Sequence, residues 1–220
     1  MGIREIEIAA ESIIIHELDN VCDSITGCPL TGSWLWRSAI VLAEFMSTHL
    51  HFQTKSVLEL GAGAGLPGLT AARLGATRVV LTDIQLLLPG LINNVVANGL
   101  EDRVEVRELV WGSDESEMSR LGELGEFDIV LMSDVFYDAE EMVGLGKTLK
   151  KVCGKGTMVW AVSEMRPWTS ECVNELMSQG FGVIESPCQL GGKQDNNNNS
   201  LESFAVYRLI PPIEENCHVA

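Results

Sequence analysis

The stretch Val57-Leu58-Glu59-Leu60-Gly61-Ala62-Gly63-Ala64-Gly65-Leu66-Pro67-Gly68 decides the fold of this 220-residue chain. Its first residues are β-compatible and predict a strand. The glycines that follow predict a tight turn, because glycine adopts backbone conformations that other residues avoid. Pro67 suits the first turn of a helix. In open α/β sheets a ligand lies at the carboxyl ends of the strands. We therefore expect a nucleotide-like ligand above residues 61–65, close to the free N–H groups of the helix.

Around this stretch, strand-like segments alternate with segments of helical spacing. Strands are predicted at 56–60, 78–82, 104–110, 127–132, 157–162, 180–185 and 202–209, and helices at 34–50, 66–74, 85–98, 139–152 and 168–179. Repeated strand–helix units imply a mostly parallel sheet with helices on both faces. The last two strands have no helix between them and imply an antiparallel hairpin. The expected fold is a Rossmann-like three-layer α/β sandwich, with seven strands and an antiparallel last strand.

The two ends of the chain lie outside this alternation. We expect an N-terminal extension at 1–33, a single α/β domain at 34–210 and a C-terminal tail at 211–220. Within the extension, Ile13-Ile14-Ile15 predicts a strand whose sheet the sequence does not identify. The polar tract at 191–200 predicts a mobile hairpin loop, with contact to a substrate as the alternative.

The composition restricts the classes of function. A net charge of −16 and a pI near 4.5 oppose general binding to nucleic acid and favour a basic partner, or serve solubility alone. No apolar stretch approaches the roughly 20 residues that a membrane helix needs. No signal peptide is evident. The six cysteines and four histidines lack metal-ligand spacing. We predict a cytoplasmic protein without a metal site, small enough to enter the nucleus.

Two acidic residues accompany the glycines and narrow the choice of ligand. Asp83 follows the second predicted strand, the position from which a carboxylate binds ribose hydroxyls. Glu59 precedes the glycines, where a carboxylate opposes a pyrophosphate but suits a cationic amino group. The third glycine of the dinucleotide fingerprint is also displaced. The set favours S-adenosyl-L-methionine, bound by these two acids and by Gly61, Ala62 and Gly63. The alternative is a glycine-rich turn beside an unrelated surface aspartate.

Four segments together resemble one enzyme family. The stretch 57–69 is similar to the first motif of the seven-β-strand class I methyltransferases. Three further segments narrow the resemblance to methyltransferase family 16, which contains many protein-lysine methyltransferases: Gly32-Ser33-Trp34-Leu35-Trp36, Leu109-Val110-Trp111-Gly112, and Phe127-Asp128-Ile129-Val130-Leu131-Met132-Ser133-Asp134-Val135-Phe136-Tyr137 with its D-x-x-Y signature. The resemblance covers about 30–210 and makes 34–210 a methyltransferase domain. One departure is Arg37, which follows Trp36 where the family commonly has aspartate.

The resemblance implies roles for five residues. Trp36 lines the methionine end of the cofactor, where an indole facing a sulfonium cation contributes about 0.5–2 kcal/mol. Trp111 covers the adenine, and Ser133 meets it through its backbone. Asp134 receives a hydrogen bond from the acceptor amine, and Tyr137 orients that amine. The alternatives are packing for the two indoles and capping of the following segment for Asp134.

The predicted function is S-adenosylmethionine-dependent methylation of a protein lysine. The acidic charge favours a protein substrate with a basic segment. The chain lacks the [DN]-P-P-[FY] tetrapeptide of enzymes that methylate nucleobases or glutamine amides. Two alternatives stay open: an arginine or small-molecule acceptor on the same fold, and a non-catalytic cofactor-binding partner protein. The sequence carries no indication of oligomeric state.

Overall fold

A seven-stranded mixed sheet forms the centre of the molecule. The structure is a computed structural model and describes residues 2–18, 21–22, 27, 29–113, 126–188 and 203–212. The strand order is β5-β4-β3-β6-β7-β9-β8. The strands are β3 (Ser56–Leu60), β4 (Arg78–Asp83), β5 (Val104–Glu108), β6 (Ile129–Ser133), β7 (Met158–Glu164), β8 (Gly182–Cys188) and β9 (Phe204–Ile210). The strands from β5 to β7 pair in parallel, and β9 runs antiparallel to both of its neighbours. The predicted fold class is confirmed.

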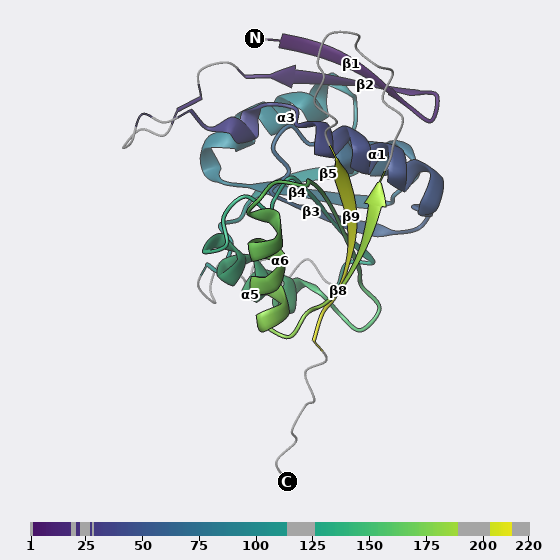
Figure 1. Ribbon diagram of the computed structural model, residues 1–220. Coiled ribbons are helices and arrows are strands. Elements are labelled where there is room, and N and C mark those ends of the chain that lie inside the picture. The colour runs from purple at the N-terminus through teal and green to yellow at the C-terminus, as the bar shows by residue number, and fades with distance from the viewer. Residues whose placement is uncertain are drawn as a thin grey trace.

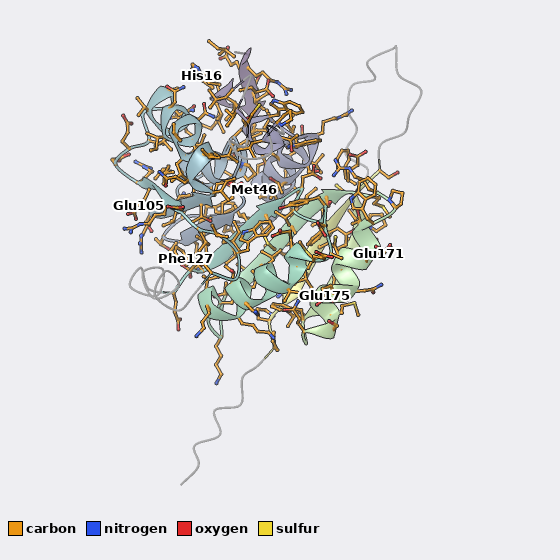
Figure 2. The ribbon with its side chains drawn as sticks, turned by 90° about the vertical axis from the view of Figure 1, so that its left-hand side faces the viewer. His16, Met46, Glu105, Phe127, Glu171 and Glu175 are labelled. Carbon is orange, nitrogen blue, oxygen red and sulfur yellow. The ribbon has the colours of Figure 1, made fainter. Side chains whose placement is uncertain are left out.

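Helices cover both faces of this sheet. One face carries α1 (Arg37–His49), α2 (Leu66–Arg73) and α3 (Leu88–Ala97), and the other carries α5 (Glu141–Val152) and α6 (Thr169–Ser178). Figure 1 shows α5 and α6 side by side, away from α1 and α3. Met46 of α1 is fully buried and lies near the centre of the view in Figure 2. Two apolar cores, one on each face, therefore hold the layers together.

The alternation of side chains along β3 divides its residues between the two cores. Val57 packs in the core beneath α1 and α2, whereas Leu58 and Leu60 pack in the core beneath α5. Because successive residues of a strand point to opposite faces, Glu59 shares the face of Val57. Its carboxylate meets the backbone of α2 there, where its Oε2 accepts the N–H of Gly68.

A separate hairpin of β1 (Gly2–Ile8) and β2 (Glu11–Glu17) precedes the main domain. The strand predicted at 13–15 lies in β2. The alternation of Glu5, Ile6, Glu7 and Ile8 is also typical of a half-buried strand, but β1 was not predicted. Asn94 of α3 and Asn98, which follows this helix, attach β2. Asn98 pairs with the backbone N–H and C=O of Ile14 at 2.9 and 2.7 Å, and Asn94 accepts the N–H of His16 at 2.8 Å. His16 is labelled on this hairpin in Figure 2.

Two predicted helices begin later than expected. Residues 31–33 form η1 (Thr31–Ser33), and Trp36 has an extended backbone, so α1 starts at Arg37. No side chain caps the start of α1. The helix predicted at 85–98 is divided into η2 (Gln85–Leu87) and α3, which has Pro89 in its first turn.

Some expectations concern parts of the chain that are not described. The polar tract at 191–200 and residues 213–220 of the predicted tail lie outside the described residues. The domain limits at 33 and 210 stay a prediction. Within the described ranges, no helix is long and apolar enough to cross a membrane.

Candidate active site

A cavity of about 450 Å³ opens at the carboxyl ends of β3, β4 and β6. The structure brings nine of the ten predicted site residues to its wall: Trp36, Gly61, Ala62, Gly63, Asp83, Trp111, Ser133, Asp134 and Tyr137. Only Glu59 does not line it. The described residues contain no group of three or more histidine, cysteine or acidic side chains that could hold a metal ion. The polar and aromatic groups of this wall include glycine backbone, carboxylates, indoles, the phenol of Tyr137 and the guanidinium of Arg166.

The glycine loop between β3 and α2 forms the floor of the cavity and allows no side chains at its closest approaches. Gly63 has a φ of +54°, and a Cβ there would lie 2.6 Å from the carbonyl oxygen of Gly32. Gly61 has a φ of +62°, and a Cβ there would lie 2.9 Å from the ring of Trp111. The loop is thus pressed between η1 on one side and the indole of Trp111 on the other.

Glu59 supports this loop from below. Its side chain is fully buried, and burial raises its pKa to about 8, with a smaller rise from the charge of Asp83 and an opposing effect of the Gly68 N–H. Its Oε2 accepts that N–H at 2.8 Å. The prediction that this carboxylate meets a cationic amino group directly does not fit its position, because the side chain points beneath α2 and away from the cavity.

Asp83 at the end of β4 reaches the cavity and also fixes the loop. Its Oδ2 accepts the N–H of Gly63 at 2.7 Å, and its Oδ1 accepts the N–H of Ile84 at 2.8 Å. Burial raises its pKa, while these two N–H groups oppose that rise. Each carboxylate oxygen keeps a second lone pair, so Asp83 can still accept hydroxyl groups of a ligand.

The indoles of Trp36 and Trp111 both line the cavity. The Nε1–H of Trp36 donates to the carbonyl of Thr31 at 3.0 Å, which orients the ring. The cation that faces this ring is Arg166, whose Cζ lies 5.4 Å from the ring centroid. Trp111 lies beside Tyr137, with ring centroids 6.2 Å apart. Trp34, the other indole of the 32–36 motif, is 43 % exposed and lies at the rim of the cavity.

Asp134 follows β6 in a backbone conformation that is rare for a residue with a side chain. Its φ is +55°, at a cost on the order of 1 kcal/mol, and its N–H donates to the carbonyl of Val162 at 2.9 Å. The guanidinium of Arg166 donates to both carboxylate oxygens, at 3.0 and 3.1 Å. The hydroxyl of Ser38 donates to Oδ1 at 3.2 Å. These contacts hold a buried carboxylate toward the cavity.

Tyr137 stands at the open side of the cavity and keeps its proton. The side chain is half exposed, yet partial burial and the charges of Glu141, Asp83 and Asp138 raise its pKa to about 12. At neutral pH its hydroxyl is therefore a hydrogen-bond donor and acceptor rather than a base. This fits orientation of an acceptor rather than removal of its proton.

Comparison with known proteins assigns the family. Residues 21–179 match the family described as lysine methyltransferase. The chain belongs to the lysine methyltransferase family. Protein N-lysine methyltransferase METTL21A of Danio rerio is 35% identical over 180 residues, which cover 80% of this chain and 76% of that protein. The METTL21A protein of Xenopus tropicalis is 33% identical over 155 residues, 69% of each chain. Protein N-terminal and lysine N-methyltransferase EFM7 of Gibberella zeae is 32% identical over 210 residues, 86% of this chain and 73% of that protein.

Solved structures of low sequence identity share the fold of this lysine methyltransferase. Precorrin-6y C5,15-methyltransferase of Geobacter metallireducens aligns with a TM-score of 0.56 at 14% identity, over 78% of this chain and 85% of that one. The ribosomal protein L11 methylase of Lactobacillus delbrueckii aligns with a TM-score of 0.55 at 16% identity, over 80% and 78%. The likeness confirms the class I methyltransferase fold.

Arg166 lines the cavity of this lysine methyltransferase and binds Asp134, and the sequence analysis did not single it out. It lies just after β7, and its Nη2 also donates to Glu164 at 2.7 Å. Burial alone lowers the pKa of the guanidinium, but Asp134 and Glu164 more than offset this, so the pKa is raised. A basic residue after the fifth predicted strand was the available signal, but a lone charge in a loop is common.

Proposed function

We propose that this chain transfers a methyl group from S-adenosyl-L-methionine to a lysine side chain of a protein with a basic segment. The observation that carries the proposal is that the glycine loop and the carboxylate of Asp83, which accepts the N–H of Gly63, line one cavity. Relatives named protein N-lysine methyltransferases support the acceptor class.

The cavity wall fits this cofactor. Gly61, Ala62 and Gly63 present backbone without obstruction, and Asp83 has free lone pairs for ribose hydroxyls. Trp111 offers an apolar surface for an adenine ring, and Trp36 offers a π face toward a cation. When bound, S-adenosylmethionine supplies a methyl group on a positively charged sulfur, which is an electrophile for in-line displacement.

Asp134 and Tyr137 supply the acceptor position. A lysine amine has an ordinary pKa of about 10.4, so its neutral form at pH 7 costs about 4.6 kcal/mol. Partial burial and a nearby positive charge lower that pKa. Asp134 then accepts a hydrogen bond from the amine, and the protonated Tyr137 orients the lone pair. Positioning of this kind needs no strong base.

The surface charge around the opening supports a basic substrate. Asp138 and Glu140 are solvent-accessible beside Tyr137, and Glu141 lines the cavity. With a net charge of −16 for the whole chain, this edge attracts Lys- and Arg-rich segments. The same field opposes nucleic acid.

A labelling experiment tests the proposal. The pure protein is incubated with methyl-labelled S-adenosylmethionine and a cell lysate, and labelled bands are hydrolysed to identify the methylated amino acid. We expect methyl-lysine in a discrete protein band. Asp134→Ala should lower the labelling rate at least about 100-fold, while calorimetry shows cofactor binding retained. Asp102→Ala, at an exposed aspartate outside the cavity, serves as the control.

Other outcomes of the same experiment contradict the proposal. Methyl-arginine in the band would change the acceptor class. Cofactor binding without any labelled band would favour a small-molecule acceptor or a non-catalytic binding protein. Absence of cofactor binding would refute the assignment of residues 57–83.

A further inference from the structure

A second cavity of about 290 Å³ lies beside the first. Trp34, Leu35, Trp36 and Arg166 line both cavities, so they form the wall between them. Asp134 lines only the first, and Glu164 lines only the second. The guanidinium of Arg166 therefore bridges two carboxylates that belong to different cavities.

Arg166 makes the contacts that a protonated lysine would make at the acceptor position. Charge-assisted hydrogen bonds to a carboxylate and a position over an indole are available to both side-chain cations. Arg166 donates to both oxygens of Asp134 and lies over Trp36. An ammonium group that approaches Asp134 meets a positive charge at the same oxygens and is repelled by it.

We propose that Arg166 occupies the acceptor position at Asp134, and that the ammonium group of the substrate lysine displaces it. The displaced guanidinium keeps its bond to Glu164 and moves into the second cavity. This inference rests on the proposed function, because it takes Asp134 as the acceptor position. It makes Arg166 a specificity-determining residue, since only a cation delivered with sufficient binding energy reaches Asp134.

The charges around the pair are compatible with this exchange. Asp134, Glu164 and Arg166 together carry one net negative charge, so an incoming ammonium group brings the set to neutrality. Ser38 is neutral and donates to Asp134. The wall of the second cavity also includes the exposed Arg37, so the displaced guanidinium depends on its bond to Glu164 at 2.7 Å to stay there.

The test measures binding of n-butylammonium to the full chain without cofactor. The indole N–H signal of Trp36, identified by its loss in Trp36→Phe, reports binding in nitrogen-15 spectra. Arg166→Met should bind the probe about tenfold more tightly than the unchanged chain, equivalent to about 1.4 kcal/mol. Asp134→Asn should abolish this binding. Arg103→Met removes an arginine paired with an adjacent exposed aspartate and should change nothing.

Several results would overturn the inference. Equal or weaker probe binding by Arg166→Met would make Arg166 a purely structural partner of Asp134, as would a lowered melting temperature with unchanged affinity. Probe binding that survives Asp134→Asn, or no binding by any variant, would also refute it. Should Arg166→Met fail to fold, Arg166→Lys keeps the charge without the bidentate pair and should bind the probe more tightly than the unchanged chain. No methyl transfer is measured, so this result is separate from that of the labelling experiment.

Discussion

The two halves of the sheet use acidic side chains in opposite ways. Near the ends of β3 and β4, Glu59 and Asp83 accept hydrogen bonds from backbone N–H groups: Glu59 from Gly68 of α2, and Asp83 from Gly63 of the glycine loop and from Ile84. At the ends of β6 and β7, Asp134 and Glu164 bind the side chain of Arg166. Backbone partners are fixed by the fold, whereas a long side chain can be exchanged for another cation. One half is therefore suited to hold a ligand in a fixed place, and the other is suited to admit one.

The largest expected effect comes from filling the glycine loop. Gly63→Ala adds a Cβ 2.6 Å from the Gly32 carbonyl in a left-handed conformation, and should cost about 3 kcal/mol of unfolding free energy. Urea denaturation measures this. Gly156→Ala is the matched control, because nothing lies within 4 Å of a Cβ there. Equal midpoints for the two variants would show that the loop is not tightly packed.

Glu59→Gln should change the pH dependence of stability. Burial raises the pKa of Glu59 from its ordinary value of 4.5 to about 8 in the folded chain. The stability that its proton contributes is therefore fully present below about pH 4.5 and is lost as the pH rises through 8. Glutamine lacks this titration, so the variant should gain on the order of 2 kcal/mol relative to the unchanged chain between pH 5 and pH 8. If the unfolding free energies of the variant and the unchanged chain ran parallel between pH 5 and pH 8, the pKa of Glu59 would not be raised by burial.

Asp83→Asn tests the fixed half of the sheet with an isosteric change. An amide cannot accept both the Gly63 and the Ile84 N–H through oxygen, so one N–H is left facing an NH₂ group. We expect a loss of about 1–2 kcal/mol in unfolding free energy. Calorimetry should also show weaker S-adenosylmethionine binding. If Asp83→Asn kept both its stability and its affinity for S-adenosylmethionine, Asp83 would not be the residue that fixes the glycine loop.

Glu164→Gln tests the exchangeable half and should have the smallest effect. The Glu164 side chain is 31% exposed, and Arg166 retains its two bonds to Asp134. The variant should lose about 0.5 kcal/mol of unfolding free energy. Thermal denaturation beside Asp83→Asn gives the comparison directly. A loss as large as that of Asp83→Asn would mean that the two halves do not differ in this way.

The sequence predicted the fold and most of the cavity wall because both depend on local patterns. The glycines of 61–65, the acid after β4 and the D-x-x-Y segment each lie where a strand ends, and strand ends meet at one edge of the sheet. Glu59 was misplaced for a physical reason. Nearness to the loop along the chain suggested contact with the ligand, but the alternation of β3 turns its side chain beneath α2.

Two features required the tertiary structure. The bond between Arg166 and Asp134 joins loops that follow different strands, and no spacing in the sequence indicates it. The asparagines that attach the N-terminal hairpin lie far from it along the chain. Trp36 was expected within a helix because its spacing fits one, but η1 directs the chain into α1 only from Arg37 onward.

The asparagine contacts allow the β1–β2 hairpin to report on the state of the glycine loop. Asn94 accepts the N–H of His16 and also donates to the carbonyl of Ala64 in the glycine loop at 3.0 Å. The side chain of Asn94 therefore links the glycine loop directly to the backbone amide of His16, near the start of the chain. Hydrogen exchange at His16 should slow when a ligand fixes the loop. Removing the first 17 residues would deprive Asn94 of its His16 partner, so we expect such a truncation to loosen the contact of Asn94 with the glycine loop.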